Sequence, residues 1–319
     1  MILTVTLNAA IDRTVAVPNF RLGRRHRAVE RSTVAGGKGV NVARSLKLLG
    51  RPVIATGLAG GPTGTRILEQ LTEESILNDF TRIADESRTN IAVVDPTSGE
   101  QTEINERGPS VASEEIDRFA EKLLYLAQGA AFCVIAGSIP AGVDPDVYGR
   151  LIGELQRLGL PALLDTEGDP MRAGLRAGPA VVAPNVIEAE EAVGHEFNEP
   201  DDLLLGLQSL IEMGAAEAII TREDGCVAIL GEPADRRRFE VEIEPLEPVS
   251  TVGSGDAFLA GYVAARYGGG SERECLAHGV ACGAQSTQHF GAGSVDRAEV
   301  ERLLPRVEVR ELDVPAGVA

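Results

Sequence analysis

The sequence predicts an α/β fold in which a mostly parallel sheet lies between two layers of helices and carries a small β-sheet lid. Three observations support this prediction. Short apolar runs alternate with longer helical patterns, the alternation is interrupted twice by short paired strands, and no apolar run reaches the length of a membrane helix. The chain has 319 residues, 44% of them hydrophobic, which is enough for one large domain with a small addition.

The expected strands of the core are short and apolar, and helical periodicity separates them. They lie at residues 1–7, 53–57, 132–136, 162–165, 180–183 and 218–221. The expected helices include residues 40–49, 65–74, 113–128 and 144–158. This alternation indicates βαβ units, and therefore parallel strands with helices on both faces of the sheet.

Two excursions break this rhythm and predict the lid. Residues 14–17 pair with residues 28–34, and residues 90–95 pair with residues 101–105 across a Pro-Thr-Ser-Gly turn. Because strand pairs this short bury little surface alone, we expect them to cover the carboxyl ends of the parallel strands, where open α/β sheets bind ligands. The predicted core comprises residues 1–12, 36–88 and 108–319, and the predicted lid comprises residues 13–35 and 89–107.

Composition and charge exclude several classes of protein. The net charge of −18 argues against a nucleic-acid partner, which calls for a basic surface. Residues 1–7 read as a first strand and not as a secretion signal, so we expect a cytoplasmic protein without membrane contact. The four cysteines are Cys133, Cys226, Cys275 and Cys282. They are far apart and form no C-x-x-C pair, which predicts reduced, buried thiols and argues against a zinc or iron–sulfur site.

One segment, residues 21–51, has the opposite charge to the rest of the chain. It contains a single acid, Glu30, and a net charge of +8. The basic residues are Arg21, Arg24, Arg25, Arg27, Arg31, Lys38, Arg44, Lys47 and Arg51. Such a segment can attract a small anion, although most charge runs are solvated faces.

Residues 250–258, Ser-Thr-Val-Gly-Ser-Gly-Asp-Ala-Phe, predict an anion site with an acid inside it. Gly253 and Gly255 let the backbone turn tightly before a helical pattern that begins at Ala257. The positive end of that helix and its free N–H groups then point at one spot. Asp256 lies in the first turn, where it can cap the helix or accept a proton from a substrate hydroxyl.

A second glycine-rich segment precedes another helix. Gly36, Gly37 and Lys38 come just before Asn41, so that a bare backbone and an amide are offered to a ligand rich in hydroxyl groups. The spacing is not that of a Walker P-loop. Asp12 follows the first strand and is either a surface turn residue or a carboxylate that holds sugar hydroxyls.

These motifs resemble the signatures of the PfkB, or ribokinase-like, carbohydrate kinases over nearly the whole chain. The most similar branch is the one that acts on sugar phosphates, that of 1-phosphofructokinase and tagatose-6-phosphate kinase. The segments that carry this resemblance are Asn8-Ala-Ala-Ile-Asp12, Arg88-Thr-Asn90, Thr102-Glu-Ile-Asn-Glu106, Ala136-Gly-Ser-Ile-Pro140, Leu164-Asp-Thr166 and Pro184-Asn-Val-Ile-Glu188, with the two glycine-rich stretches.

The resemblance implies a ribokinase-like three-layer fold and a role for each motif. Asp256 would be the general base, beside an anion hole formed by Gly253, Ser254 and Gly255. The sugar would contact Asp12, Gly36, Gly37, Asn41 and Ser138, and its phosphate would be clamped by Arg27, Lys38 and Arg88, with Arg24, Arg25 and Arg31 as alternatives. ATP and Mg²⁺ would be held by Asn185, Glu188, Thr221, Gly225 and Ser250, with Glu188 the metal residue, acting through water.

Several departures from the family pattern leave the phosphoryl donor open. Ala183 stands where many relatives have a lysine, residues 220–225 form a loop one residue shorter than usual, and Ser250 replaces an aspartate of the ribokinase-type members. Residues 282–288 also lack an asparagine expected on the adenine side. Asn185 and Glu188 have a simpler interpretation as well, as the N-cap and third residue of a helix.

The leading hypothesis is an ATP- and Mg²⁺-dependent kinase that phosphorylates fructose 1-phosphate at its 6-hydroxyl. Tagatose 6-phosphate and fructose 6-phosphate, phosphorylated at the 1-hydroxyl, stay open as substrates. An alternative of another class is a regulatory protein that binds a sugar phosphate and has lost efficient nucleotide binding. The intact Asp256 disfavours this alternative. A kinase of ribose or a nucleoside is disfavoured by the basic segment and Arg88. The resemblance implies a homodimer, because in relatives the lid strands often pair between two subunits, and the sequence itself shows only edge strands that need covering.

Overall fold

The computed structural model describes residues 1–289 and 291–312, so the part of the predicted core at residues 290 and 313–319 lies outside it. Within the described residues, the main sheet has ten strands in the order β14-β13-β12-β11-β10-β9-β8-β1-β4-β5. These are β1 (Ile2–Thr6), β4 (Val53–Gly60), β5 (Leu77–Ile83), β8 (Phe132–Ala136), β9 (Ala162–Asp165), β10 (Val181–Val182), β11 (Glu217–Arg222), β12 (Gly225–Leu230), β13 (Arg237–Glu242) and β14 (Glu308–Leu312).

The sheet is parallel from β5 through β1 to β11, as predicted, and antiparallel from β11 to β14. The sequence analysis did not predict β5 or the meander of β12 to β14. Strands β5 and β13 mix polar and apolar side chains because only part of each is buried. Their patterns therefore lack the continuous apolar run that marks the inner parallel strands.

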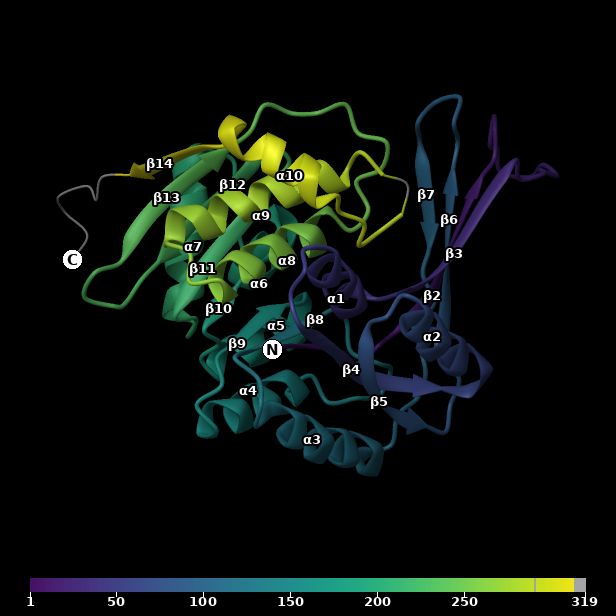
Figure 1. The fold of residues 1–319 in the computed structure, drawn as a ribbon, viewed down its shortest axis with the longest axis horizontal. Helices are drawn as coiled ribbons and strands as arrows, with labels where there is room; N and C mark the ends of the chain where they lie inside the picture. Colours follow the sequence, from purple (N-terminus) through teal and green to yellow (C-terminus); the bar gives the residue numbers. More distant parts are fainter. Residues whose placement is uncertain (290, 313–319) are drawn as a thin grey trace.

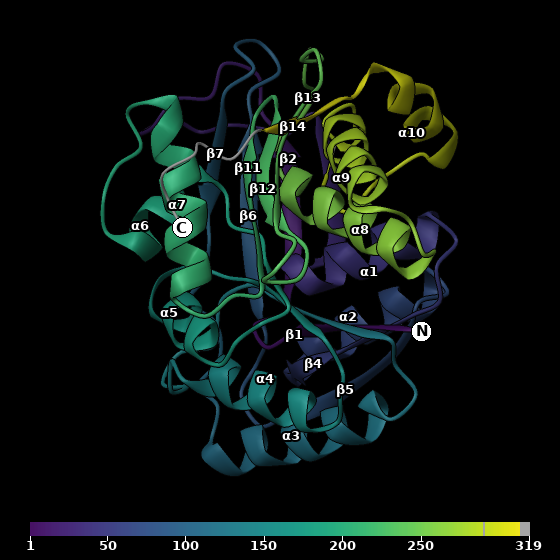
Figure 2. The same cartoon turned by 90° about the vertical axis from the view of Figure 1, so that its left-hand side faces the viewer.

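Two layers of helices cover the sheet (Figure 1 and Figure 2). One layer, defined by a shared apolar cluster, consists of α1 (Lys38–Leu48), α2 (Gly61–Glu73), α8 (Ser254–Tyr267), α9 (Glu272–Ser286) and α10 (Arg297–Leu303). The other layer consists of α3 (Ser113–Ala127), α4 (Val147–Arg157), α5 (Gly168–Arg176), α6 (Val186–Val193) and α7 (Pro200–Glu212). The three-layer α/β/α core is therefore as predicted.

Side chains of the central strands alternate between the two layers. On β1, Ile2 packs into the cluster of α1 and α8, whereas Leu3 and Val5 pack into the cluster of α3 and α4. On β8, Val134 joins the first cluster, and its two chain neighbours join the second. This alternation follows from the twofold repeat of a strand. None of the helices in the described part of the chain is long and apolar enough to cross a membrane.

A separate sheet of four strands extends from one end of the core (Figure 1). Its order is β3-β2-β6-β7, from β2 (Ala10–Ala16), β3 (Glu30–Gly36), β6 (Arg88–Val94) and β7 (Gln101–Ile104). The two antiparallel pairs are those predicted, and the parallel pairing of β2 with β6 joins them into one sheet. Strands β2 and β6 begin at Ala10 and Arg88, earlier than the sequence pattern indicated.

Gly57 offers a test of the close contact between β1 and β4. Its φ is +151°, and a Cβ there would lie 2.0 Å from the carbonyl oxygen of Thr6. We expect Gly57→Ala to reduce the free energy of unfolding by about 3 kcal/mol or more, because backbone must move to admit the methyl group. Urea denaturation measures this change.

Gly153→Ala is the matched control for that substitution. Gly153 lies within α4, and a Cβ there would meet no atom within 4 Å. Alanine should therefore leave stability unchanged or raise it by up to about 1 kcal/mol. Equal denaturation midpoints for the two variants would contradict the proposed role of Gly57.

Candidate active site

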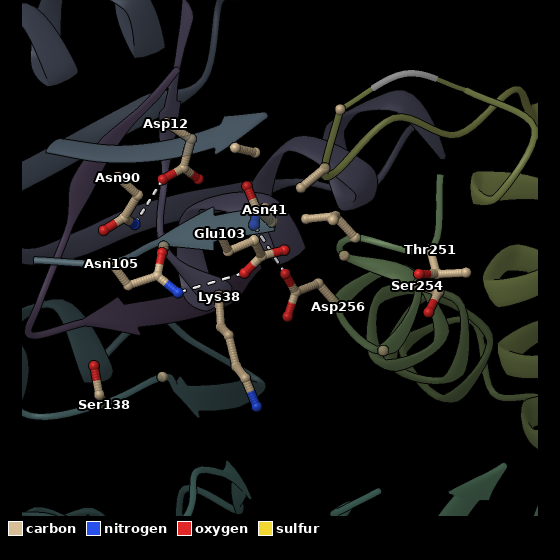
Figure 3. Close-up of a pocket in the computed structure, with 18 of the residues that line it drawn as sticks. Asp12, Lys38, Asn41, Asn90, Glu103, Asn105, Ser138, Thr251, Ser254 and Asp256 are labelled. Atoms are coloured by element: carbon tan, nitrogen blue, oxygen red, sulfur yellow. Dashed lines mark hydrogen bonds between the residues drawn. The ribbon is translucent and has the colours of Figure 1, made fainter. Parts of the chain in front are cut away.

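A pocket of about 520 Å³ lies between the lid and the carboxyl ends of the parallel strands (Figure 3). Residues from both sheets and from the first turns of α1, α6 and α8 line it. The sequence-predicted site residues on its wall are Asp12, Gly37, Lys38, Asn41, Arg88, Ser138, Asn185, Glu188, Thr221, Ser250, Gly253, Ser254, Gly255 and Asp256. Gly36, Arg27 and Gly225 are not among the lining residues.

The N-terminus of α8 opens directly onto this pocket. Gly253 is the N-cap with φ +78°, and a Cβ on it would lie 2.6 Å from the Cβ of Ala292. Glycine is therefore required at this turn, whereas Gly255 faces open space. The helix begins at Ser254, three residues before the start that its apolar pattern indicated. The N–H of Ser254 donates to the carbonyl of Thr251 at 3.3 Å, and the other N–H groups of the first turn, with the positive end of the helix, can stabilise an anion in the pocket.

Asp256 lies in the first turn of α8 and is 5% exposed. Burial raises the pKa of its carboxyl to about 7, and the negative charge of Asp165 adds to this effect. Lys38 and a 2.9 Å hydrogen bond from Nδ2 of Asn41 to Oδ2 of Asp256 lower the pKa in part (Figure 3). A carboxylate with such a pKa can accept a proton at neutral pH.

Lys38 begins α1, and its side chain runs along the floor of the pocket. Its Nζ donates to Oδ1 of Asp165 and to Oε1 of Glu188, both at 2.9 Å. Desolvation alone would lower the pKa of Lys38, but the charges of these two acids outweigh it and raise the pKa. Lys38 is thus paired with acids from β9 and α6, a contact that the sequence analysis did not predict.

Asp12 lies on β2 and faces the pocket from the lid. Its Oδ1 accepts a hydrogen bond of 2.8 Å from Nδ2 of Asn90 on β6 (Figure 3). Burial raises its pKa, while the bond from Asn90 and the charge of Arg88 oppose the rise. A Cβ on Gly36 would lie 1.8 Å from Oδ2 of Asp12. Gly36 therefore makes room for this carboxylate even though it does not line the pocket.

Arg88, at the start of β6, is the one predicted clamp arginine on the pocket wall. Its Nε donates to the carbonyl of Asn8 at 3.2 Å, and its Nη1 donates to the carbonyl of Glu106 at 3.0 Å. Burial lowers the pKa of its guanidinium, and the charge of Asp12 opposes this effect. Ser138 lies nearby, and its Oγ accepts a 3.1 Å hydrogen bond from Nδ2 of Asn8.

The predicted clamp is not assembled within one chain. Arg27 and its three alternatives are exposed and do not line the pocket. Arg24, Arg25 and Arg27 belong to the loop between β2 and β3, and Arg31 belongs to β3. Lys38 lines the pocket, but its ammonium group faces Asp165 and Glu188. Of the predicted clamp cations, Arg88 therefore lines the pocket without a carboxylate partner among its hydrogen bonds.

Asn185 and Glu188 form a capping box at the start of α6. The side chain of Asn185 accepts from the backbone N–H of Glu188, and Oε2 of Glu188 accepts from the N–H of Asn185, both at 2.9 Å. The simpler helix-start interpretation is thus correct, and it coexists with a place on the pocket wall. Oxygen donors of this kind suit Mg²⁺, which prefers carboxylates and retained water.

The short loop at residues 220–225 has a physical explanation. Strands β11 and β12 pair up to Arg222 and Gly225, so only two residues turn the hairpin. A Cβ on Gly225 would lie 1.9 Å from the carbonyl oxygen of Val241, and its φ is +155°. Gly225 therefore serves the packing of this hairpin, while Thr221 faces the pocket.

Several polar residues of the site lie in segments that carry the family resemblance, but no role was predicted for them. Asp165 ends β9, where an acid after a buried apolar run was the available signal. On the lid, the inward-facing residues include Asn90, Glu103 and Asn105 (Figure 3). Every second residue of β7 faces inward, but a strand this short gives too few alternations to detect.

The chain is similar to known carbohydrate kinases along nearly its whole length. The pfkB family carbohydrate kinases match residues 3–298, nearly the whole chain. The chain belongs to the PfkB family. The 1-phosphofructokinase of Borreliella burgdorferi is 31% identical over 313 residues, which cover 98% of this chain and 99% of that protein.

Two solved structures of phosphofructokinases have a similar fold over nearly the whole chain. Phosphofructokinase-2 of Escherichia coli, solved with potassium, is 27% identical with a TM-score of 0.88, over 95% of this chain and 98% of that one. A possible 1-phosphofructokinase of Thermotoga maritima is 25% identical with a TM-score of 0.88, over 98% and 100% of the two chains. The fold is therefore ribokinase-like, and this PfkB protein is a sugar kinase.

The raised pKa of Asp256 predicts how stability depends on pH in Asp256→Asn. In the folded enzyme the pKa is about 7, against an ordinary value of 3.8, so ionising this group costs stability as the pH rises from about 4 to 7. Asparagine does not titrate. The variant should therefore gain stability relative to the wild type across this range, by up to about 1.4 kcal/mol for each pH unit.

Thermal unfolding of the two proteins near pH 5 and pH 8 measures this difference. We expect the advantage of Asp256→Asn to be larger near pH 8 and to level off above about pH 7. An advantage that is the same at both pH values would contradict the pKa assigned to this carboxyl.

Proposed function

We propose that this enzyme transfers the γ-phosphoryl group of ATP to the 6-hydroxyl of fructose 1-phosphate, giving fructose 1,6-bisphosphate. The observation that carries the proposal is the position of Asp256, a carboxyl with a pKa near 7 in the first turn of a helix whose N-terminus opens onto the pocket. A base and an anion site lie in one place, as phosphoryl transfer to an alcohol requires.

In this proposal Asp256 takes the proton from the acceptor hydroxyl as its oxygen attacks the γ-phosphorus. The bond from that phosphorus to the bridging oxygen breaks, and ADP leaves. The N–H groups of Gly253, Ser254 and Gly255 stabilise the charge on the transferred group. Most of the catalysis would then come from positioning and from charge neutralisation.

The acceptor is proposed to lie between the lid and Asp256. Asp12 and Asn90 offer hydrogen-bonding groups to its hydroxyls, and Asn90 has a buried Oδ1 without a hydrogen-bond partner in the described structure. Arg88 and Ser138 would hold the phosphate. Two of the donors of Arg88 are engaged by backbone carbonyls, which orients the guanidinium and leaves Nη2 for the ligand.

Mg²⁺ is proposed to bind beside Glu188, and the donor set fits it. Glu188 supplies hard carboxylate oxygens, but Oε2 accepts from the N–H of Asn185 and Oε1 accepts from Lys38. Contact through retained water agrees with these engaged oxygens better than direct ligation does. The ion would neutralise the ATP phosphates, while Lys38 keeps the acids of the pocket floor in place.

Three sugar phosphates are candidate substrates. Relatives named 1-phosphofructokinase favour fructose 1-phosphate, whereas phosphofructokinase-2 of Escherichia coli has been solved with fructose 6-phosphate. Tagatose 6-phosphate is the third candidate. The regulatory alternative rests on Ala183 and the two-residue hairpin turn beside the nucleotide side of the pocket.

We further propose a cytoplasmic homodimer. The structure has four buried free thiols, as expected in a reducing compartment. They are Cys133, Cys226, Cys275 and Cys282. In the four-stranded sheet, β3 and β7 are edge strands whose outer sides pair with no described strand, and a second copy could cover them. Among the relatives, an inhibited form of phosphofructokinase-2 from Escherichia coli is a tetramer.

A panel of acceptors tests the proposed reaction. ADP release from ATP and Mg²⁺ would be measured with fructose 1-phosphate, fructose 6-phosphate, tagatose 6-phosphate, fructose and ribose. We expect the highest kcat/KM with fructose 1-phosphate, falling as the pH drops below about 7 because Asp256 becomes protonated. Asp256→Asn should lower kcat by about 10²- to 10⁴-fold and spare sugar-phosphate binding.

Each other outcome of the panel has a definite meaning. Preference for another ketohexose phosphate would change the substrate and keep the mechanism. Turnover of unphosphorylated sugars alone would refute the phosphate site, and binding without turnover would favour the regulatory alternative. Full activity of Asp256→Asn would refute its role as the base.

Arg88→Gln tests the phosphate site. We expect the KM for the sugar phosphate to rise about tenfold or more, because a charge-assisted hydrogen bond is lost, while the KM for ATP stays the same. Initial rates over a range of each substrate measure both constants.

Arg66→Gln is the control for this substitution. Arg66 is exposed on α2, outside the pocket, and the same change there should leave both constants as in the wild type. Thermal unfolding of both variants checks that the lid sheet is intact. A wild-type KM for the sugar phosphate in Arg88→Gln would remove Arg88 from the proposed site.

A further inference from the structure

Arg44 lies behind the pocket wall and does not line it. It is on α1, three residues after Asn41, and its side chain is 12% exposed. Its Nη1 donates to Oδ1 of Asn41 at 3.2 Å. Because the other end of the same amide donates to Asp256, a chain of hydrogen bonds runs from Arg44 to the proposed base.

The rest of the guanidinium is fixed by other partners. Nε and Nη2 donate to the carboxylate of Glu74 at 2.6 and 3.1 Å, and Nη2 also donates to the carbonyl of Ala35 at 2.7 Å. The backbone at Gly293 covers the same group, since a Cβ there would lie 3.2 Å from Nη1. These contacts leave Nη1 in a single position, directed at Asn41.

Arg44 determines which way the amide of Asn41 faces. The two ends of an asparagine amide have nearly the same shape, so its neighbours decide the orientation. A guanidinium can only donate, and it therefore requires the oxygen of Asn41 on its own side. The NH₂ group must then face Asp256, where it stabilises the ionised carboxylate.

Without Arg44 the amide is free to turn over. Its oxygen would then face Asp256, an arrangement that is repulsive for the carboxylate and favourable for the protonated acid, whose O–H can donate to it. The other charged groups that act on Asp256 come from separate elements: Asp165 on β9, Lys38 on α1 and Asp12 on β2.

We propose that Arg44 is a positioning residue, which keeps Asp256 ready to accept a proton by fixing the amide of Asn41. The inference rests on the proposed role of Asp256 as the general base. Glu74 and Ala35 contribute by holding the guanidinium, and none of the three touches the substrate in this assignment.

The dependence of kcat on pH tests this proposal in Arg44→Met. We expect the acid limb of the profile to move up by about one pH unit, which is a tenfold loss of kcat below the limb. The rate on the alkaline plateau and the KM for ATP should stay close to the wild type, because the carboxyl is ionised there in both proteins. A loss of kcat by the same factor at every pH would overturn the proposal.

Arg44→Lys is the second variant, chosen because it keeps the charge and should fold if Arg44→Met does not. An ammonium group cannot reach Glu74, Ala35 and Asn41 together, so a smaller shift in the same direction is expected. An unchanged profile would mean that the ammonium, which also can only donate, still orients the amide, whereas a shift of the acid limb to lower pH would overturn the proposal. Lys47→Met is the matched control, since Lys47 is an exposed cation on the same helix outside the pocket, and its profile should not change.

A double-mutant cycle separates the amide from the charge. In an Asn41→Ala background, Arg44→Met should produce no further shift of the acid limb. An equal shift in both backgrounds would mean that Arg44 acts by its charge alone, which would overturn the proposal. Failure of the proposed function is distinguishable, because Asp256→Asn would then remain active whatever Arg44 does.

Discussion

Lys38 carries one positive charge into the floor of the pocket, where Asp165, Glu188 and Asp256 would otherwise place carboxylates together without a counter-charge. Burying such a set unpaired would cost several kcal/mol, and the acids would stay protonated or the segments would separate. The ammonium ties the start of α1 to the end of β9 and to α6. The shape of the pocket therefore depends on this electrostatic balance as well as on apolar packing.

The two sides of the proposed site are built from different kinds of structure. The α8 side is a helix start whose glycine turn presents backbone N–H groups, and it is held by packing against the loop at Ala292. The lid side is a four-stranded sheet that presents side chains, such as Asp12 and Asn90. Asp256 lies in the first turn of α8 and faces the pocket. Its pKa depends on both sides, because the charge of Asp12 on the lid and the charges of Asp165 and Lys38 on the core all act on it.

The core was predictable from sequence where strands are buried on both faces. The runs at residues 132–136 and 162–165 match β8 and β9 because such strands are apolar at every position. The motifs placed most of the predicted residues on one pocket wall. The partners of Lys38, Asn41 and Arg44 were not predictable, since a side-chain contact depends on tertiary neighbours that no local pattern encodes. For the same reason, the resemblance that implied a clamp role for Arg27 could not show that Arg27 lies outside the lining of the pocket in this chain.

The two sets of charges at this site differ in their exposure to dissolved ions. The ion pairs of Lys38 involve two acids that are almost fully buried and a lysine side chain that is 35% exposed, so ionic strength acts on them less than on fully exposed charges. The arginines of the loop between β2 and β3 are exposed, and their field is screened within about 10 Å at ordinary salt concentrations. Salt would therefore weaken the attraction of an anion to this loop more than it would weaken the ion pairs of Lys38.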